Sequence, residues 1–199
     1  KELYKRLNNT KICYIVDADI KGFFDHMKHE WIIKFLNLYI KDPNIIGLVK
    51  KYLKVGVLDG GELMMNEEGS AQGNIISPIL ANIYMHNVLT LWYKFIITKE
   101  CKGDKFLIVY ADDFVAGFQY KWEAENCYKL LKERMEKFGL QLEESKSHLL
   151  QSGAYIARAK QKSGESTRLE TFDFLGFTFY CGRSRKGMSY IMPKTSSKK

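Results

Sequence analysis

The segment FLIVYADDFVAGF, residues 106–118, decides how this chain folds. Four apolar residues lead into Tyr110 and Ala111, the adjacent Asp112 and Asp113 follow, and the chain then turns apolar again. The two apolar runs are typical of buried strands, so the pattern predicts two strands with a pair of carboxylates at the turn. Carboxylates that are taken out of water need a compensating cation. An Asp-rich turn in solvent is the alternative explanation.

A second apolar run supplies a third carboxylate. KICYIVDADI, residues 11–20, predicts another buried strand, and Asp19 lies at its end. If the two strands lie side by side, Asp19 joins Asp112 and Asp113. Carboxylates on rigid strands suit Mg²⁺, which also accepts water and substrate phosphates as ligands. Two such ions ~3.5–4 Å apart can activate an attacking hydroxyl and stabilise a leaving oxygen, which is the chemistry of nucleotidyl transfer.

Composition favours a globular chain with a polyanionic partner. The length of 199 residues suits one domain or one domain with a piece of another. The hydrophobic share of 46% is enough to bury a sizeable core. Lys and Arg number 31 against 23 acidic residues, and this net charge of +8 favours nucleic acid as the partner. A solvated, slightly basic surface explains the same balance equally well.

The cysteines and the longest apolar stretch bear on the compartment. No two cysteines form a C-x-x-C pair, which favours a reduced compartment and disfavours a zinc site; they are Cys13, Cys101, Cys127 and Cys181. Residues 75–97 are apolar but interrupted by Pro78, Asn82 and Lys94, so we interpret them as a buried helix and expect no membrane partner.

Helical spacing of apolar residues predicts four helices. The first falls within residues 26–40, and Asp42 caps a second that begins at Pro43, with Ile45, Ile46, Val49 and Leu53 on its core face. Pro78 opens a third, with its core face at Leu80, Ile83, Tyr84, Val88, Leu91, Trp92 and Phe95. The fourth covers residues 121–138 and ends at Gly139, with Trp122, Cys127, Leu130, Leu131, Met135 and Phe138 inward.

The remaining segments are predicted as strands and loops. Residues 55–65 form a hairpin around Asp59-Gly60-Gly61, and residues 157–170 are polar enough for a mobile loop. Residues 171–182 and 187–192 are two strands around the basic turn Arg183–Lys186, where solvated charge is favoured over phosphate binding. Strands and helices mix without βαβ repetition, which predicts an α+β fold, an antiparallel sheet with helices packed on one face.

Five segments together resemble the palm of a reverse transcriptase, of the group II intron-encoded (maturase) family. They are DADIKGFFD (17–25), GSAQGNIISPILANIY (69–84), YADDF (110–114), GLQLEESKSHLL (139–150) and FDFLGF (172–177), in the order of that family. The resemblance implies that Asp19 and Asp112 bridge two Mg²⁺ ions, with Asp113 nearby and the Ile20 backbone carbonyl as a further ligand. It also implies Lys146 as the proton donor to the pyrophosphate leaving group.

The same resemblance implies how nucleotide and primer are held. Phe24 would pack beneath the sugar of a dNTP and clash with a 2′-hydroxyl, while Gln72 and Gly73 would contact the nascent base pair. The primer end would lie against a turn made of Phe174, Leu175, Gly176 and Phe177. Ala71 replaces the family's usual proline and Asn74 a frequent glycine, which changes loop rigidity without removing a ligand.

The implied domain assignment is residues 1–190 as palm with part of the fingers region and 191–199 as a linker toward the thumb, which is largely absent. We expect a cytoplasmic (bacterial) RNA-directed DNA polymerase, part of a longer chain and not required to be active as this segment alone. Its expected partners are RNA template or intron RNA, DNA primer or target DNA, and dNTPs. A homodimer is possible through surface left exposed. The alternatives are a retron or CRISPR-associated reverse transcriptase and a non-polymerising RNA-binding scaffold. An RNA-dependent RNA polymerase is disfavoured, since those enzymes usually carry Gly-Asp-Asp.

Overall fold

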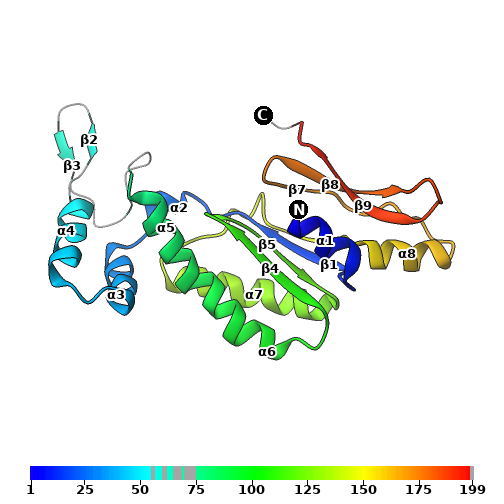
Figure 1. Cartoon of the computed structure of the whole chain (residues 1–199), viewed down its shortest axis with the longest axis horizontal. Coiled ribbons are helices and arrows are strands. Elements are labelled where there is room, and N and C mark those ends of the chain that lie inside the picture. The colour runs from blue at the N-terminus through cyan, green and yellow to red at the C-terminus, as the bar shows by residue number, and fades with distance from the viewer. Residues whose placement is uncertain (55–56, 60–61, 65–68, 70–74, 198–199) are drawn as a thin grey trace.

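A four-stranded antiparallel sheet forms the centre of the computed structural model, which describes residues 1–54, 57–59, 62–64, 69 and 75–197 (Figure 1). Its order is β4-β5-β1-β6, with bounds β4 Lys105–Tyr110, β5 Asp113–Phe118, β1 Tyr14–Ala18 and β6 His148–Gln151. β1 lies between β5 and β6, so the predicted strands that carry the aspartates are neighbours.

One face of this sheet packs against helices. α7 (Lys121–Lys137) contacts β1, β5 and β6, and a helical segment over residues 77–100 crosses beside it (Figure 1). Because strand side chains alternate between faces, Val16, Phe114 and Ala116 point to this helical layer and belong to one buried cluster with Leu131 and Tyr84. The α+β class and the helix-covered face are as predicted.

The other face of the sheet packs against a second, smaller layer. It contains α1 (Glu2–Asn9), α8 (Ala154–Lys162) and an antiparallel sheet of order β7-β8-β9 (Figure 1), with bounds β7 Phe172–Phe174, β8 Phe177–Arg183 and β9 Ser189–Thr195. The alternate residues Ile15, Val115 and Leu150 are buried here, in a separate cluster with Phe172 and Ile191.

A helical extension lies beyond one end of the sheet. It comprises α2 (Phe23–His26), α3 (His29–Tyr39), α4 (Pro43–Lys54) and the hairpin strands β2 (Val57–Asp59) and β3 (Glu62–Met64) (Figure 1). Asp42 caps α4 as predicted, since its Oδ1 accepts a hydrogen bond from the Asn44 backbone N–H at 2.8 Å. Ile45 was wrongly assigned to the core face; it is 46% exposed, because the face turned inward carries Ile46, Val49 and Leu53.

The predicted long helix from Pro78 is continuous but not uniformly α-helical. α5 (Ser77–Met85) is followed by the π-helical segments η1 (His86–Thr90) and η2 (Tyr93–Ile97) and by α6 (Thr98–Glu100). Each π turn takes up an extra residue, so the buried face shifts along the sequence. Phe95, expected inside, is therefore half-exposed, and Tyr93 and Ile97 are buried.

Three further expectations need correction. The helix α8 overlaps the first part of the loop expected over residues 157–170, because Ala154 and Ala157 pack against the core through side chains too small to mark a helix. Trp122, expected inside α7, is half-exposed in its first turn. Residues 171–182 are two strands, divided at the turn that the resemblance implied, and β9 runs to Thr195, past the expected strand end at residue 192.

The end of α7 matches the sequence in detail. Gly139 has a φ of 77°, and its backbone N–H bonds the Glu136 carbonyl while the Leu140 N–H bonds the Met135 carbonyl. This pair of bonds is the Schellman motif, which glycine favours because it reaches positive φ without strain. The motif sends the chain from α7 back toward the end of β1.

Candidate active site at the ends of β1 and β5

The three predicted aspartates come together at one edge of the central sheet. Ala18 pairs with Phe114 across β1 and β5, so Asp19 and Asp113 extend that register by one step on each strand. By the alternation of the pleat, both side chains lie on the face shared with Ile15 and Val115, opposite the face that packs against α7. Asp112 precedes Asp113 in the turn between β4 and β5.

That turn holds a strained residue. Tyr110 pairs with Asp113, which leaves Ala111 and Asp112 as a two-residue hairpin loop, and Ala111 has a φ of 53°. A non-glycine residue in this region is uncommon and costs of order 1 kcal/mol, and such strain is concentrated at functional sites. The tight turn keeps the two carboxylates on a rigid tip instead of a loose loop.

The carboxylates repel one another in this arrangement. The pKa of Asp113 is raised, first by partial burial and then by the charges of Asp112 and Asp19. Both causes disfavour the ionised form. The tip therefore concentrates negative charge that the protein does not itself fully neutralise.

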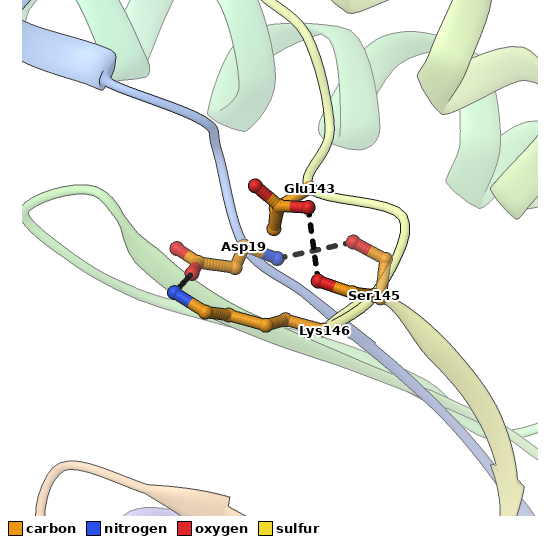
Figure 2. Close-up of polar contacts among 5 residues, drawn as sticks. Asp19, Glu143, Ser145 and Lys146 are labelled. Carbon is orange, nitrogen blue, oxygen red and sulfur yellow. Dashed lines mark hydrogen bonds and ion pairs between the residues drawn. The ribbon is translucent and has the colours of Figure 1, made fainter.

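Lys146 neutralises part of that charge. Its Nζ lies 3.0 Å from Asp19 Oδ2 (Figure 2), and this hydrogen bond is the main reason that the pKa of Lys146 is raised. The loop that carries Lys146 is tied to β1, because the Glu143 N–H donates to the Asp19 carbonyl at 2.8 Å and the Asp19 N–H lies 3.3 Å from Ser147 Oγ. The Ser145 hydroxyl donates to Glu143 Oε1 at 2.9 Å, which orders the loop further.

The Ile20 carbonyl, predicted as a further ligand, does not take part in the pairing with the Leu142 segment. Ile20 forms an isolated antiparallel bridge with Leu142, flanked by the bonds from Glu143 N–H to the Asp19 carbonyl and from Lys21 N–H to the Gln141 carbonyl. In such a pair the backbone groups of Ile20 face the opposite strand edge, which is the β5 edge. The Ile20 side chain itself is buried in the core.

The chemical type of these groups suits a hard divalent cation. Within the described residues, no three His, Cys, Asp or Glu side chains already form a metal-binding cluster. The donors are nevertheless oxygen atoms of the type that Mg²⁺ prefers, and the raised pKa of Asp113 marks charge that a cation would relieve. The residues that would hold the ion are Asp19, Ile20, Asp112 and Asp113.

A cleft of about 590 Å³ is lined by residues from the ends of β1 and β5 and from the β7–β9 sheet, without Asp112. Asp19, Asp113 and Lys146 line one side, and Phe174, Leu175 and Gly176 line the other. The segment predicted to grip the primer thus faces the candidate catalytic groups. Phe177, the last residue of that segment, is half-exposed and does not line this cleft.

The turn between β7 and β8 is also strained. Phe174 pairs with Phe177, and the two residues between them, Leu175 and Gly176, have φ values of 49° and 77°. Positive φ at both positions is the type I′ hairpin turn, in which Asn-Gly is the preferred pair and leucine is unusual. The Ser196 N–H bonds the Gly176 carbonyl at 2.9 Å and ties the chain beyond β9 to the turn.

Phe24, predicted as the sugar gate, is half-buried in α2, and its ring centroid lies 5.4 Å from that of the buried Phe23. Gly69 approaches its backbone closely, since a Cβ there would meet the Phe24 carbonyl oxygen at 3.3 Å. The Gly69 N–H bonds the Met27 carbonyl at 2.9 Å. Gln72 and Gly73 lie outside the described residues.

Several residues of the cleft were not predicted from the sequence. Asp17 pairs with His148 across β1 and β6, and both side chains line the cleft together with Asp173 and Lys194. Asp17 had a signal, because it lies two residues from Asp19 on the same face of a strand. Asp173 and Lys194 had none, since only the tertiary contacts bring them there.

The fold agrees with the family to which the chain belongs. Residues 3–179 match the family model for reverse transcriptase (RNA-dependent DNA polymerase), so the chain is a member of that family. The structural neighbours show the same fold: an apo telomerase from Candida tropicalis has a TM-score of 0.66 and 16% identity over 95% of this chain and 33% of its own. A telomerase from Candida albicans, in complex with a fragment of telomeric RNA, has a TM-score of 0.62 and 15% identity over 92% of this chain and 30% of its own.

Two of the curated relatives are named after introns. The group II intron-encoded protein LtrA of Lactococcus lactis subsp. cremoris is 39% identical over 92 residues, 46% of this chain and 15% of its own length. An uncharacterized 91 kDa protein in the cob intron of Schizosaccharomyces pombe is 41% identical over 81 residues, 40% of this chain and 10% of its own. The matched part is therefore a small share of those proteins. In the described part of this chain, no helix is long and apolar enough to cross a bilayer.

Proposed function

We propose that the protein is an RNA-directed DNA polymerase that transfers nucleotides from dNTPs to a primer 3′-hydroxyl. The observation that carries the proposal is the meeting of Asp19 and Asp113 at the ends of β1 and β5, in one cleft with residues 174–176. Carboxylates on two adjacent strand ends, facing a hairpin that can hold a strand end, provide the two halves of such a reaction centre. Membership in the reverse transcriptase family supports the same reading.

In the proposed reaction, the primer 3′-oxygen forms a bond to the α-phosphorus of the dNTP as the bond to pyrophosphate breaks. Two bound Mg²⁺ ions would lower the pKa of the attacking hydroxyl and stabilise the charge on the leaving oxygen. Asp19, Asp112 and Asp113 would hold them, with the Ile20 carbonyl on the same edge. Lys146 would give a proton to the leaving pyrophosphate, since a lysine side chain is protonated at neutral pH.

Selection of the sugar falls to Phe24. Its ring is only half-buried and sits on α2, directly after the strand end that carries Asp19. Beneath a bound dNTP, the ring would leave no room for a 2′-hydroxyl, the group that separates ribonucleotides from deoxyribonucleotides. Gln72 and Gly73 complete this proposal as contacts to the nascent base pair.

The biological setting that we propose is a group II intron. The named relatives are intron-encoded or intron-associated proteins, so the partners would be the intron RNA, as template and as splicing substrate, and its DNA target. A retron or CRISPR-associated reverse transcriptase is the alternative, and the sequence that flanks this region in the gene would separate these settings.

Primer extension tests the chemistry directly. The assay uses the full-length protein, an RNA template, a DNA primer, dNTPs and Mg²⁺, and compares wild type with Asp112→Asn/Asp113→Asn. Glu133→Gln/Glu136→Gln, on the exposed surface of α7, removes two charges far from the cleft and serves as the control. We expect extension by wild type and control and none by the aspartate variant. A folded wild type that binds RNA but extends nothing would leave a scaffold function in place of the polymerase.

A further inference from the structure

A second groove lies away from the catalytic cleft, between α8 and the turn that joins β8 to β9. Its volume is about 740 Å³, and its walls include Tyr155, Arg158, Lys162, Lys186 and Met188. The sequence did not reveal this groove, because it predicted a loop where α8 lies. The helix brings its own basic residues next to the basic turn at residues 183–186.

Hydrogen bonds hold the two walls of the groove together. Gln161 Oε1 accepts from the backbone N–H and the hydroxyl of Ser189, at 3.1 and 2.8 Å, and Gln161 Nε2 donates to the Gly187 carbonyl at 2.7 Å. Arg158 Nε donates to the Ser189 carbonyl at 3.1 Å. Ser189 is fully buried, so the contact excludes water. The groove is therefore preformed, and a ligand does not have to order it.

The groove is lined by positive charge. Arg158, Lys162 and Lys186 line it, and no acidic residue does. The chain from residue 174 to residue 199 contains no Asp or Glu at all. Glu165 is the acid next along the chain from α8, and it accepts a hydrogen bond from the Ser163 hydroxyl at 2.7 Å. Across the described residues, Lys162 and Lys186 have no carboxylate within ion-pair distance.

Exposed apolar side chains lie among these cations. Tyr155 is 45% exposed and Met188 is 52% exposed, and both line the groove. Cations beside an exposed aromatic ring are the combination that binds single-stranded nucleic acid, since bases stack on the ring while the phosphates meet the positive charge. A purely phosphate-binding surface would not need the exposed tyrosine.

The position of the groove separates it from the reaction centre. The paired strands β8 and β9 run from the Phe177–Thr195 pair, next to the catalytic cleft, to the Arg183–Ser189 pair, next to the groove (Figure 1). Six residue steps along a strand span ~20 Å. A strand in the groove is therefore outside the site where the primer end and the nucleotide meet.

We propose that this groove binds single-stranded RNA, with a base stacked on Tyr155 and the backbone along Lys162 and Lys186. The choice of RNA over DNA rests on the proposed function. The groove then anchors the RNA partner at a distance from the template–primer junction, so it contributes to RNA affinity without contributing to the chemical step.

Fluorescence anisotropy with a labelled single-stranded RNA tests the proposal in the full-length protein. Lys162→Gln/Lys186→Gln removes two cations, and Lys129→Gln/Lys137→Gln on the exposed surface of α7 is the matched control. We expect the groove variant to bind about tenfold more weakly and its salt slope to fall by about 1.4, with the control unchanged. Tyr155→Ala should also weaken binding about tenfold while leaving the salt slope as in wild type.

Three results would overturn this assignment. Unchanged RNA affinity in both groove variants would show that the groove does not bind RNA. Equal losses of affinity in the groove and control variants would show that the lysines act only through nonspecific charge. Tighter binding of single-stranded DNA than of RNA of the same sequence would exclude RNA as the partner. Primer extension by the groove variants on saturating template is measured in parallel. Absence of primer extension by the wild type would count against the proposed polymerase activity, whereas the anisotropy results test the groove alone.

Discussion

Lys146 Nζ lies 3.0 Å from Asp19 Oδ2, so the lysine implied as a proton donor contacts a carboxylate implied as a metal ligand. Two roles of Lys146 follow, one as the partner of Asp19 and one as an acid. Substitutions separate them, because arginine keeps the ion pair but does not release a proton, whereas glutamine loses both.

We predict that Lys146→Gln and Lys146→Arg both slow single-turnover primer extension by ~10²-fold, the lower range for general acid catalysis. Only Lys146→Gln should bind Mn²⁺ more tightly in the absence of nucleotide, because it alone frees Asp19 from a competing cation. Manganese titration followed by electron paramagnetic resonance measures this second effect. Full activity of the arginine variant would remove the acid role and keep the ion pair.

The carboxylate tip predicts a pH-dependent change in stability. The raised pKa of Asp113 means that its native-state stabilisation is present below the unfolded pKa, near 3.9, and is lost as pH rises through the native value. At pH 7 without metal, Asp113→Asn should therefore raise Tm by about 1–2 °C, since solvent screens much of the repulsion.

This difference should disappear at about pH 3, where Asp113 is protonated in the wild type as well. Mg²⁺ should reverse its sign at pH 7, because the wild type keeps a ligand that the variant lacks. Differential scanning calorimetry at both pH values, with and without Mg²⁺, measures the four cases. A lower Tm for Asp113→Asn without metal would show that repulsion among the carboxylates does not destabilise the folded protein.

The half-buried ring of Phe24 predicts sugar selectivity. Phe24→Ala should admit ribonucleotides and reduce the preference for dNTPs by about 10²-fold in kcat/KM, the scale on which a pocket rejects one added hydroxyl. Phe24→Tyr keeps the ring and should keep the preference. Competitive incorporation of dNTP and rNTP measures the ratio. An unchanged ratio in the alanine variant would assign the residue to the core.

The strained turn beside the cleft gives a prediction in which stability and function move apart. Leu175→Asn creates Asn-Gly, the favoured pair for this type I′ turn, and should raise Tm by ~2–4 °C. If the exposed leucine contacts the primer, KM for the primer rises in the same variant. Leu175→Val, a β-branched residue at positive φ, should lower Tm. A lower Tm for the asparagine variant would contradict the inference that Leu175 is strained in this turn.

The hydrogen bonds of Asn8 predict a contribution to the stability of the layer that contains α1 and β9. Its side-chain amide donates to the Ile191 carbonyl at 3.0 Å and accepts from the Ile191 N–H at 2.9 Å, which joins α1 to β9 in a buried contact. Asn8→Ala leaves both backbone groups without this partner and should lower the free energy of unfolding by ~2 kcal/mol. Asn9→Ala, exposed on the same helix, is the control for urea denaturation.

Local signals in the sequence predicted the parts that later proved to be neighbours. The apolar runs before Asp19 and around Asp112 are strands, and the Asp42 cap and Gly139 stop are where the local chemistry placed them. The predictions that failed have two causes. α8 buries alanines that carry little hydrophobic signal, and the π turns shift a helical face in a way that a period of 3.6 does not anticipate.

The sequence by itself determined the strands, the helix ends and the pair of aspartates at a tight turn, because these depend on residues close together in the chain. Only the tertiary structure decided that β1 lies between β5 and β6 and that Lys146 reaches Asp19 across 127 positions. It also decided that α8 and the β8–β9 turn share a basic groove. The physical reason is that strand pairing and docking between layers depend on burial shared by distant segments, which no local periodicity records.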